Sequence, residues 1–294
     1  MPEPAPSPPV DRLCALLRRH YVFADRVEAL CDALRAPAPD GLDGHGIAAW
    51  LTDRLQSVTP DAHLRVRWFD HVPDDEPGED AEASRFDAAR SDRFGIARVD
   101  RLDGGRLGLI EISEFYPLEW ISAAVAQAME TLAGVRVLVF DLRRCRGGEP
   151  GGVACWASYL FGAQPVHLND LYLRTEGRTE SWWTRPELPG PRFVEQPVYV
   201  LVSAATFSAA EEFAYDLQAL GRGTVVGERT RGGANPGSIH RLDAHFAVFI
   251  PDARAINPVT GDNWEGRGVA PDRPCAADQA LELARRLGRE VSGG

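Results

Sequence analysis

Two nearly continuous apolar runs, VRVLVF at 135–140 and VYVLV at 198–202, constrain the fold of this chain more than any other feature. A strand that is apolar along its whole length must be covered on both faces, as in a parallel sheet between layers of helices. Helical and strand patterns alternate around these runs: helices at 118–133, 153–161, 208–220 and 277–290, and strands at 94–101, 107–112, 224–226 and within 239–250. The sequence therefore predicts an α/β fold.

The first 60 residues follow a different pattern. Residues 1–10 are rich in proline and are predicted to form a disordered tail. Apolar residues then recur at helical spacing on three successive faces, so residues 11–60 are predicted to form an N-terminal helical bundle and residues 61–294 the α/β core. A strand is expected at 64–68. The acidic, proline-bearing stretch 71–92 has no period and is expected to be an exposed loop.

Net charge limits the binding partners that we expect, and the lack of long apolar segments limits the expected location. The 294 residues include 32 basic side chains and 43 aspartates and glutamates. The resulting net charge of −11 repels nucleic acid and anionic membranes. No apolar run approaches the ~18 residues that cross a bilayer, and the opening MPEPAPSPPV lacks the basic and apolar regions of a secretion signal. We expect a cytoplasmic protein with no nucleic-acid or membrane partner, and the oligomeric state stays open.

Two residue types exclude particular chemistries. The chain contains no lysine, so all 32 basic residues are arginines, which remain protonated and form no Schiff base. Pyridoxal enzymes, Schiff-base aldolases, P-loop NTPases and Ser–Lys hydrolases are therefore excluded. The five cysteines form no C-x-x-C pair and indicate neither a zinc site nor a disulfide framework. No metal or cofactor is expected.

The segment SAATFSAAEEFAYDL at 203–217 follows the second apolar run and opens a helix at Ser208. Ser208 and Glu211 match the capping box S-x-x-E, so the serine can be interpreted as a helix cap. It can also be interpreted as a nucleophile, because the free amides and the dipole at a helix N-terminus stabilise an oxyanion. These residues alone leave both interpretations open.

A second segment, DLRRCRGG at 141–148, runs from the first apolar strand into a glycine turn. Gly147 and Gly148 either make a tight turn or offer backbone amides to an oxyanion, since no side chain blocks the approach. Folds of this type bind ligands at the carboxyl ends of their strands. We therefore expect the glycines to lie near Ser208, with the amides of Gly147 or Gly148 and of Ala209 forming an oxyanion hole.

These segments, together with GERTRGGANPG at 227–237 and NWEGRGVAPD at 263–272, resemble the S41 family of serine peptidases, the tail-specific proteases, over about residues 60–275. The resemblance implies a crotonase/ClpP-like ββα spiral as the core. The N-terminal helices resemble those of the interphotoreceptor-retinoid-binding-protein-like branch. The chain offers no space for the PDZ domain that the C-terminal processing proteases insert, so none is expected.

The resemblance also implies the catalytic residues, with one departure. Where the processing proteases have a catalytic lysine, this chain has Gly233. The branch that the tricorn protease resembles uses Ser–His–Glu with a helper serine beside the histidine. Its histidine matches His63 in DAHLRV, its glutamate matches Glu265, and its helper serine falls on Ala62.

This assignment predicts a serine hydrolase that cleaves peptide bonds through an acyl-enzyme. Ser208 attacks the acyl carbon, His63 acts as base and then acid, and Glu265 orients His63. Two alternatives remain: a hydrolase or acyl-transfer enzyme for a small-molecule ester, thioester or amide, and a non-catalytic protein that binds an apolar ligand. Either Arg143 or Arg231 could hold a substrate carboxylate, and the sequence does not choose between them.

Overall fold

The computed structural model describes residues 9–70 and 79–291, and these residues form two compact units. The first unit comprises the described residues before 71 together with Leu171–Glu180 and Asn235–Ala255, and the second comprises Glu79–Asp170, Ser181–Ala234 and the described residues from 256 on. The predicted boundary at residue 60 differs from this division, because strands after residue 60 share a core with the N-terminal helices. Residues 1–8 of the expected tail lie outside the description.

The helices lie at α1 (Val10–His20), α2 (Val27–Leu34), α3 (Gly44–Val58), α4 (Glu79–Ser91), α5 (Leu118–Thr131), α6 (Pro150–Ser158), α7 (Ala209–Ala219) and α8 (Ala280–Val291). The strands lie at β1 (Arg65–Trp68), β2 (Ile96–Leu102), β3 (Leu107–Ile112), β4 (Val137–Asp141), β5 (His167–Leu173), β6 (Arg178–Trp183), β7 (Val198–Val202), β8 (Thr224–Gly227), β9 (Gly237–Arg241), β10 (Phe246–Pro251), β11 (Ala253–Ile256) and β12 (Arg273–Pro274). Within the described residues, no helix combines the length and hydropathy that a membrane crossing requires.

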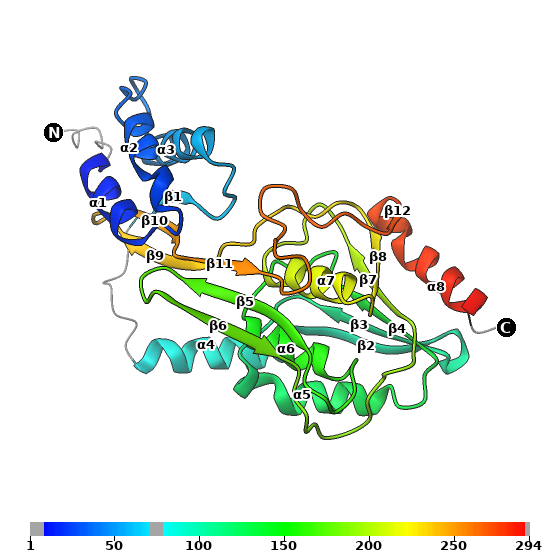
Figure 1. Ribbon diagram of the computed structural model, residues 1–294. Helices are drawn as coiled ribbons and strands as arrows, with labels where there is room; N and C mark the ends of the chain where they lie inside the picture. The colour runs from blue at the N-terminus through cyan, green and yellow to red at the C-terminus, as the bar shows by residue number, and fades with distance from the viewer. Residues whose placement is uncertain (1–8, 71–78, 292–294) are drawn as a thin grey trace. The chain divides into compact units, whose positions relative to one another are not determined.

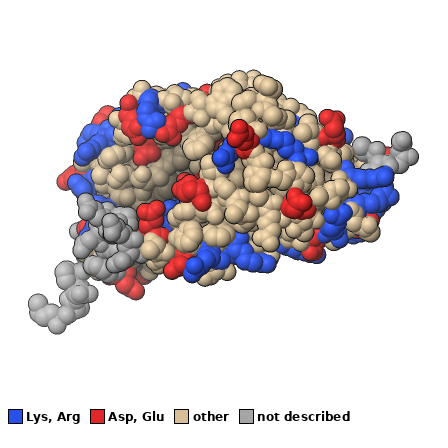
Figure 2. Space-filling model, turned by 90° about the horizontal axis from the view of Figure 1, so that it is seen from below, with Lys and Arg blue, Asp and Glu red and all other residues tan. Residues whose placement is uncertain are grey.

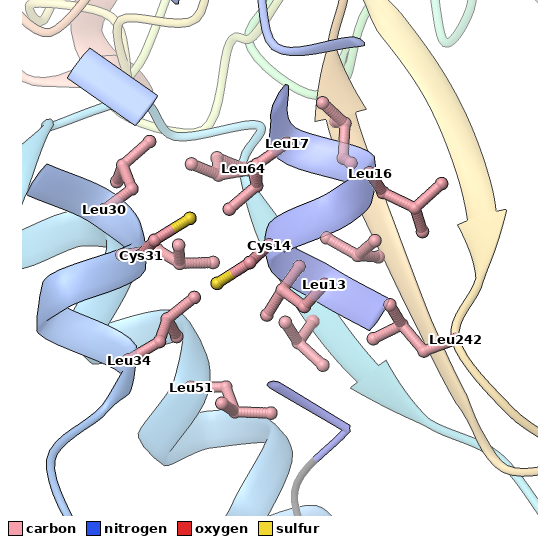
Figure 3. Packing of buried hydrophobic residues seen from close by; sticks show 14 of the residues in the cluster. Leu13, Cys14, Leu16, Leu17, Leu30, Cys31, Leu34, Leu51, Leu64 and Leu242 are labelled. Atoms are coloured by element: carbon pink, nitrogen blue, oxygen red, sulfur yellow. The ribbon is translucent and has the colours of Figure 1, made fainter. Parts of the chain in front are cut away.

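The first unit packs the three predicted helices α1, α2 and α3 on an antiparallel sheet of order β1-β10-β9. Leucines from all three helices point into one core with Cys14 and Cys31, which face each other between α1 and α2 (Figure 3). Burial, reinforced by Cys31, raises the pKa of Cys14 to about 12, so this thiol stays protonated at neutral pH. The pair acts as small apolar packing groups.

The second unit is built on a six-stranded sheet of order β12-β8-β7-β4-β3-β2. All neighbouring pairs are parallel except β2 and β3. Every residue of β4 and β7 is buried, because α8 packs on one face and α6 and α7 on the other (Figure 1). Phe140 of β4, for example, contacts Trp156 of α6 and Phe213 of α7 at ring distances of 5.9 and 5.0 Å. The α/β prediction is confirmed.

Helix α4 and strands β5 and β6 differ from the sequence expectation. Within the stretch 71–92, residues 79–91 form helix α4 instead of a loop, and residues 71–78 lie outside the description. Alanine, glutamate and arginine favour the helix although the segment lacks an apolar period; Phe86 and Ala89 provide its packing. Strands β5 and β6, which pair with β11 in a third sheet, were not expected either.

The C-terminal helix α8 is held by ion pairs as well as by its apolar face. Arg285 forms a close ion pair with Asp103, and Arg289 lies 3.8 Å from the same carboxylate. In Figure 2, arginine side chains gather near the end of α8, while basic and acidic side chains intersperse over the rest of that face. These contacts fix α8 to the turn between β2 and β3.

Candidate active site

The turn after β7 is bound directly to the loop after β4. Thr206 donates its hydroxyl to the carbonyl of Leu142 at 2.9 Å, and Ser203 donates its hydroxyl to the carbonyl of Arg143 at 2.6 Å. The amide of Phe207 donates to the carbonyl of Cys145 at 3.3 Å. Both strands therefore end in one hydrogen-bonded assembly, which places the start of α7 beside the glycine turn, as the parallel-sheet argument predicted.

Ser208 adopts a backbone conformation that side-chain-bearing residues rarely occupy. Its φ of 56° and ψ of −126° belong to a region that glycine accepts and other residues enter at a cost of ~1–3 kcal/mol. A serine kept in this conformation between a strand and a helix has the geometry of a nucleophile elbow, in which a sharp turn presents the hydroxyl. A helix cap requires only an extended backbone, so this strain favours the nucleophile interpretation.

Gly147 lies directly against Ser208. A Cβ on Gly147, whose φ is +115°, would approach the Ser208 Cβ to 2.7 Å and the Ala209 amide nitrogen to 3.1 Å. Gly148, with φ of +130°, packs on the Phe115 backbone, to which the carbonyl of Gly147 and the amide of Glu149 bind. Within the described residues, the amides of Gly147, Gly148 and Ala209 make no hydrogen bond.

Glu211 organises the surroundings of Ser208 beyond the capping box. Its carboxylate accepts from the amide of Ser208 at 2.9 Å, which confirms the Glu211 half of that motif. It also accepts from the amides of Gly232 and Gly233 at 2.6 and 2.9 Å, and from the Thr230 hydroxyl at 2.5 Å. Burial raises the pKa of Glu211, and these four hydrogen bonds oppose that rise. One buried carboxylate thus ties the serine to the 230–233 loop.

Glu265 is reached through the same loop. The amide of Ala234 donates to the Glu265 carboxylate at 2.6 Å, and the indole of buried Trp264 donates to the Gly233 carbonyl at 2.8 Å. The amide of Gly266 donates to the carbonyl of Gly232 at 3.1 Å. Because Gly232 and Gly233 also bind Glu211, two layers of hydrogen bonds connect Glu265 to the helix that begins after Ser208.

His63 lies in the first unit, two residues before β1 begins. Its amide donates to the carboxylate of Asp61 at 3.1 Å, and its ring stacks on Phe249 of β10 with centroids 5.6 Å apart. Asp61 is buried and also accepts from the Asn235 side chain at 3.1 Å and from the Tyr21 hydroxyl at 3.4 Å. Burial raises the pKa of Asp61, and these hydrogen bonds oppose that rise. The residues around Asp61 therefore fix the backbone from which the imidazole projects.

Comparison with known protein families shows the family to which this chain belongs. The family model of peptidase family S41 matches residues 106–275, which is more than half of the chain. The chain belongs to peptidase family S41. Carboxyl-terminal-processing peptidase 2 of the Arabidopsis thaliana chloroplast is 30% identical over 172 residues, covering 58% of this S41 chain and 32% of that protein. This chain therefore spans about a third of the length of that relative.

Solved structures share the fold over most of this S41 chain. A protein from Parabacteroides merdae has a TM-score of 0.67 at 17% identity and covers 96% of this chain and 97% of its own. The photosystem II D1 C-terminal processing protease has a TM-score of 0.56 at 18% identity, covering 97% and 98%. The tricorn protease has a TM-score of 0.59 at 13% identity, covering 96% of this chain and 36% of its own. The expected absence of a PDZ domain stays a prediction.

The second unit brings together Ser208, Ala209, Gly147, Gly148 and, through the 230–234 loop, Glu265. The sequence argument assigned these residues but missed the polar side chains that assemble them, which are Ser203, Thr206 and Thr230. In the first unit it likewise missed Asp61, which holds the backbone of His63. It treated Glu211 only as half of a cap. Hydroxyl and carboxylate side chains at strand ends are the only sequence signal for such roles, and their partners lie far away along the chain.

The structure distinguishes the two arginines proposed for substrate binding. Arg143 forms an ion pair with Asp141 at 2.6 Å and donates to the carbonyl of Ala277 at 2.6 Å, so its guanidinium already has partners. Arg231 is exposed, and its guanidinium lies 4.8 Å from the centre of the Phe207 ring. Arg231, next to the residue that precedes Ser208, is the better placed of the two to meet a substrate carboxylate.

Two buried carboxyl groups lie one turn apart on α7. Glu212 and Asp216 are 4% and 1% exposed and face the side chains of Asn169 and Asn257. Burial raises the pKa of Glu212 to about 7, and burial with repulsion from Glu212 raises that of Asp216 well above its ordinary range. Two carboxylates in this apolar surrounding are costly to ionise together, so the pair retains protons near neutral pH.

Glu212→Gln is expected to flatten the dependence of the unfolding free energy on pH. Because the folded-state pKa of Glu212 is raised from 4.5 to about 7, its contribution to stability is full below pH 4.5 and is lost as pH rises to about 7. One such proton changes the free energy by up to ~1.4 kcal/mol per pH unit. Urea unfolding across this range measures the effect, with the exposed Glu187→Gln as control. Equal pH slopes for wild type and Glu212→Gln would contradict the assignment.

Proposed function

We propose that this S41 chain is a serine peptidase that hydrolyses peptide bonds through an acyl-enzyme on Ser208. The observation that carries the proposal is the strained backbone of Ser208, with φ of 56° at the start of α7 and Gly147 packed against it. Strain of this kind persists where a function requires it, since glycine would relieve it. Membership of a peptidase family supports the peptide bond as the bond that is cleaved.

In the proposed reaction, His63 removes the hydroxyl proton of Ser208 as the oxygen attacks the carbonyl carbon. The imidazolium then gives that proton to the leaving amine. In the second half, His63 deprotonates a water molecule that attacks the ester, and the imidazolium returns the proton to the departing Ser208 oxygen. Glu265 accepts from the other ring nitrogen of His63 and stabilises the imidazolium. The fixed backbone at Asp61 and the hydrogen bond from Ala234 to Glu265 support these roles, because both groups are held by their own surroundings.

The tetrahedral intermediate places a negative charge on the former carbonyl oxygen. We assign its stabilisation to the amides of Ala209 and of Gly147 or Gly148, which make no hydrogen bond within the described residues. Ala209 is the first residue of α7, so the helix dipole adds to the effect. No cofactor or metal is required by this mechanism.

Histidine takes the place of lysine as base in this proposal. Gly233, which falls where the processing proteases have their lysine, donates its amide to Glu211 at 2.9 Å and is buried. The position is thus part of the support of Ser208. The similarity to a carboxyl-terminal-processing peptidase supports, within the same proposal, substrates cleaved near a chain end. The cytoplasmic location stays a prediction.

A fluorophosphonate probe tests the proposal. The probe is expected to label the wild-type protein at Ser208, as mass spectrometry of the labelled peptide would show, and not to label Ser208→Ala. Gly147→Ala should label ~10²-fold more slowly, because it disturbs one oxyanion donor. Gly134→Ala is the matched control, since Gly134 also has positive φ, +81°, but has open space around it. Labelling elsewhere, or none in the folded wild type, would contradict the proposal.

A further inference from the structure

The segment that leads to Glu265 is fastened to the nucleophile helix at a second place, away from Glu211. Asn257, the residue that follows β11, donates its side-chain amide to Asp216 Oδ1 at 2.9 Å. One residue earlier on α7, the Tyr215 hydroxyl lies 3.1 Å from the Thr260 hydroxyl, and the Tyr215 ring lies 5.4 Å from Trp264. Helix α7 thus contacts this segment at three points.

Asn257 closes the segment into a compact loop. Its side-chain oxygen accepts from the amides of Val259 and Thr260 at 3.0 and 3.2 Å. Its backbone amide donates to the carbonyl of Asp262 at 2.9 Å, and its carbonyl accepts from the amide of Gly261 at 2.8 Å. Four hydrogen bonds of one fully buried residue therefore set the path of residues 257–262.

Hydrogen bonds at the end of this loop fix the position of Glu265. Asn263 accepts from the amide of Glu265 at 2.9 Å through its side-chain oxygen, and Arg267 pairs with Asp262 at 2.6 Å. The carbonyl of Trp264 accepts from the amide of Gly268 at 2.9 Å. A displacement of Asn257 would therefore move the backbone that carries the Glu265 carboxylate.

Burying the Asp216 carboxyl costs free energy that packing alone would not require. It is buried beside Glu212, and within the part of the chain that the structure describes neither carboxyl forms an ion pair with an arginine. A leucine at such a position would bury apolar surface without the cost of a polar group. What Asp216 provides instead is an acceptor for the Asn257 amide, which would otherwise be left with the Leu168 carbonyl at 3.3 Å.

We infer that Asp216 is a positioning residue, which acts through Asn257 to hold the 257–264 loop on the nucleophile helix and so to place Glu265. The inference rests on the proposed function, because it assigns Asp216 a role in orienting Glu265. Ser208 and Glu265 would then share one rigid support, since α7 begins at the first and holds the loop that ends at the second.

A double-mutant cycle tests the inference with a peptide substrate. Asp216→Ala is expected to lower kcat by ~10–100-fold with little change in KM, because a small misplacement of a catalytic group has effects of this size. In a Glu265→Ala background the same substitution should change kcat less than ~2-fold, since nothing remains to be positioned. Asp216→Asn, which keeps the acceptor oxygen, should restore kcat to within ~3-fold of wild type.

Glu212→Gln is the matched control, because Glu212 is equally buried on the same helix but has no hydrogen bond to Asn257. Its kcat should stay near that of wild type. Should Asp216→Ala not fold, Asn257→Ala replaces it in the same cycle, with circular dichroism to confirm folding. Equal losses of kcat in the wild-type and Glu265→Ala backgrounds would overturn the inference. Failure of the proposed function itself would appear separately, as turnover by Ser208→Ala.

Discussion

Ser208→Ala is expected to lower kcat on a peptide substrate by at least ~10³-fold, the loss found when a catalytic triad loses its nucleophile. The reason is chemical, because alanine has no oxygen to form the acyl-enzyme. The helix should still form, since Glu211 keeps its bonds to the backbone amides of residues 208, 232 and 233. Steady-state kinetics and circular dichroism on the same preparation measure both outcomes.

Ser208→Gly separates the chemistry from the strain. Glycine also lacks the hydroxyl, so kcat should fall as far as in Ser208→Ala. Glycine adopts φ of 56° and ψ of −126° without a Cβ clash, so Ser208→Gly should be more stable than Ser208→Ala by ~1 kcal/mol or more in urea unfolding. Normal turnover by either variant would contradict the role of Ser208. Equal unfolding free energies of Ser208→Gly and Ser208→Ala would contradict the presence of backbone strain at residue 208.

The sheet and the position of Ser208 could be predicted because they depend on local pattern. The apolar runs that became β4 and β7 are buried on both faces, which only a sheet between helices provides. Parallel strands then place the ends of β4 and β7 at one edge, so Gly147 and Ser208 meet whatever the details of the loops. The family resemblance added Glu265, whose place near the 232–234 segment no periodicity indicates.

The assembly of the site could not be predicted, because it depends on buried polar pairs between distant segments. A helical pattern marks Glu212 and Asp216 as polar residues and favours an exposed face, whereas both are buried. Asp216 binds Asn257 and Glu211 binds Thr230, although the partners lie far apart along the chain. Secondary-structure propensity describes only neighbouring residues and does not predict such pairs. Helix α4 was missed for a related reason, because its few packing residues leave no apolar period.

His63→Ala is expected to lower kcat/KM by ~10³-fold near neutral pH, because the serine hydroxyl then has no base. In the wild type, kcat/KM should rise with pH through an apparent pKa of ~6–7.5, as the imidazole loses its proton and becomes able to accept one. This rise should be absent from the residual activity of His63→Ala. His45→Ala is the matched control, because His45 is exposed on α3 of the same unit.

The same assignment predicts a distance that a crystal structure of the protein would measure. An imidazole nitrogen of His63 should lie within ~2.6–3.2 Å of the Ser208 hydroxyl, or somewhat farther without substrate. The two residues come from segments that no apolar pattern pairs, so their meeting would follow from catalysis rather than packing. Glu265 should face the other ring nitrogen, and water or a backbone group should occupy the place of the helper serine at Ala62. A different histidine beside Ser208, or full activity of His63→Ala, would show that His63 is not the base. The assignment as a hydrolase would still stand.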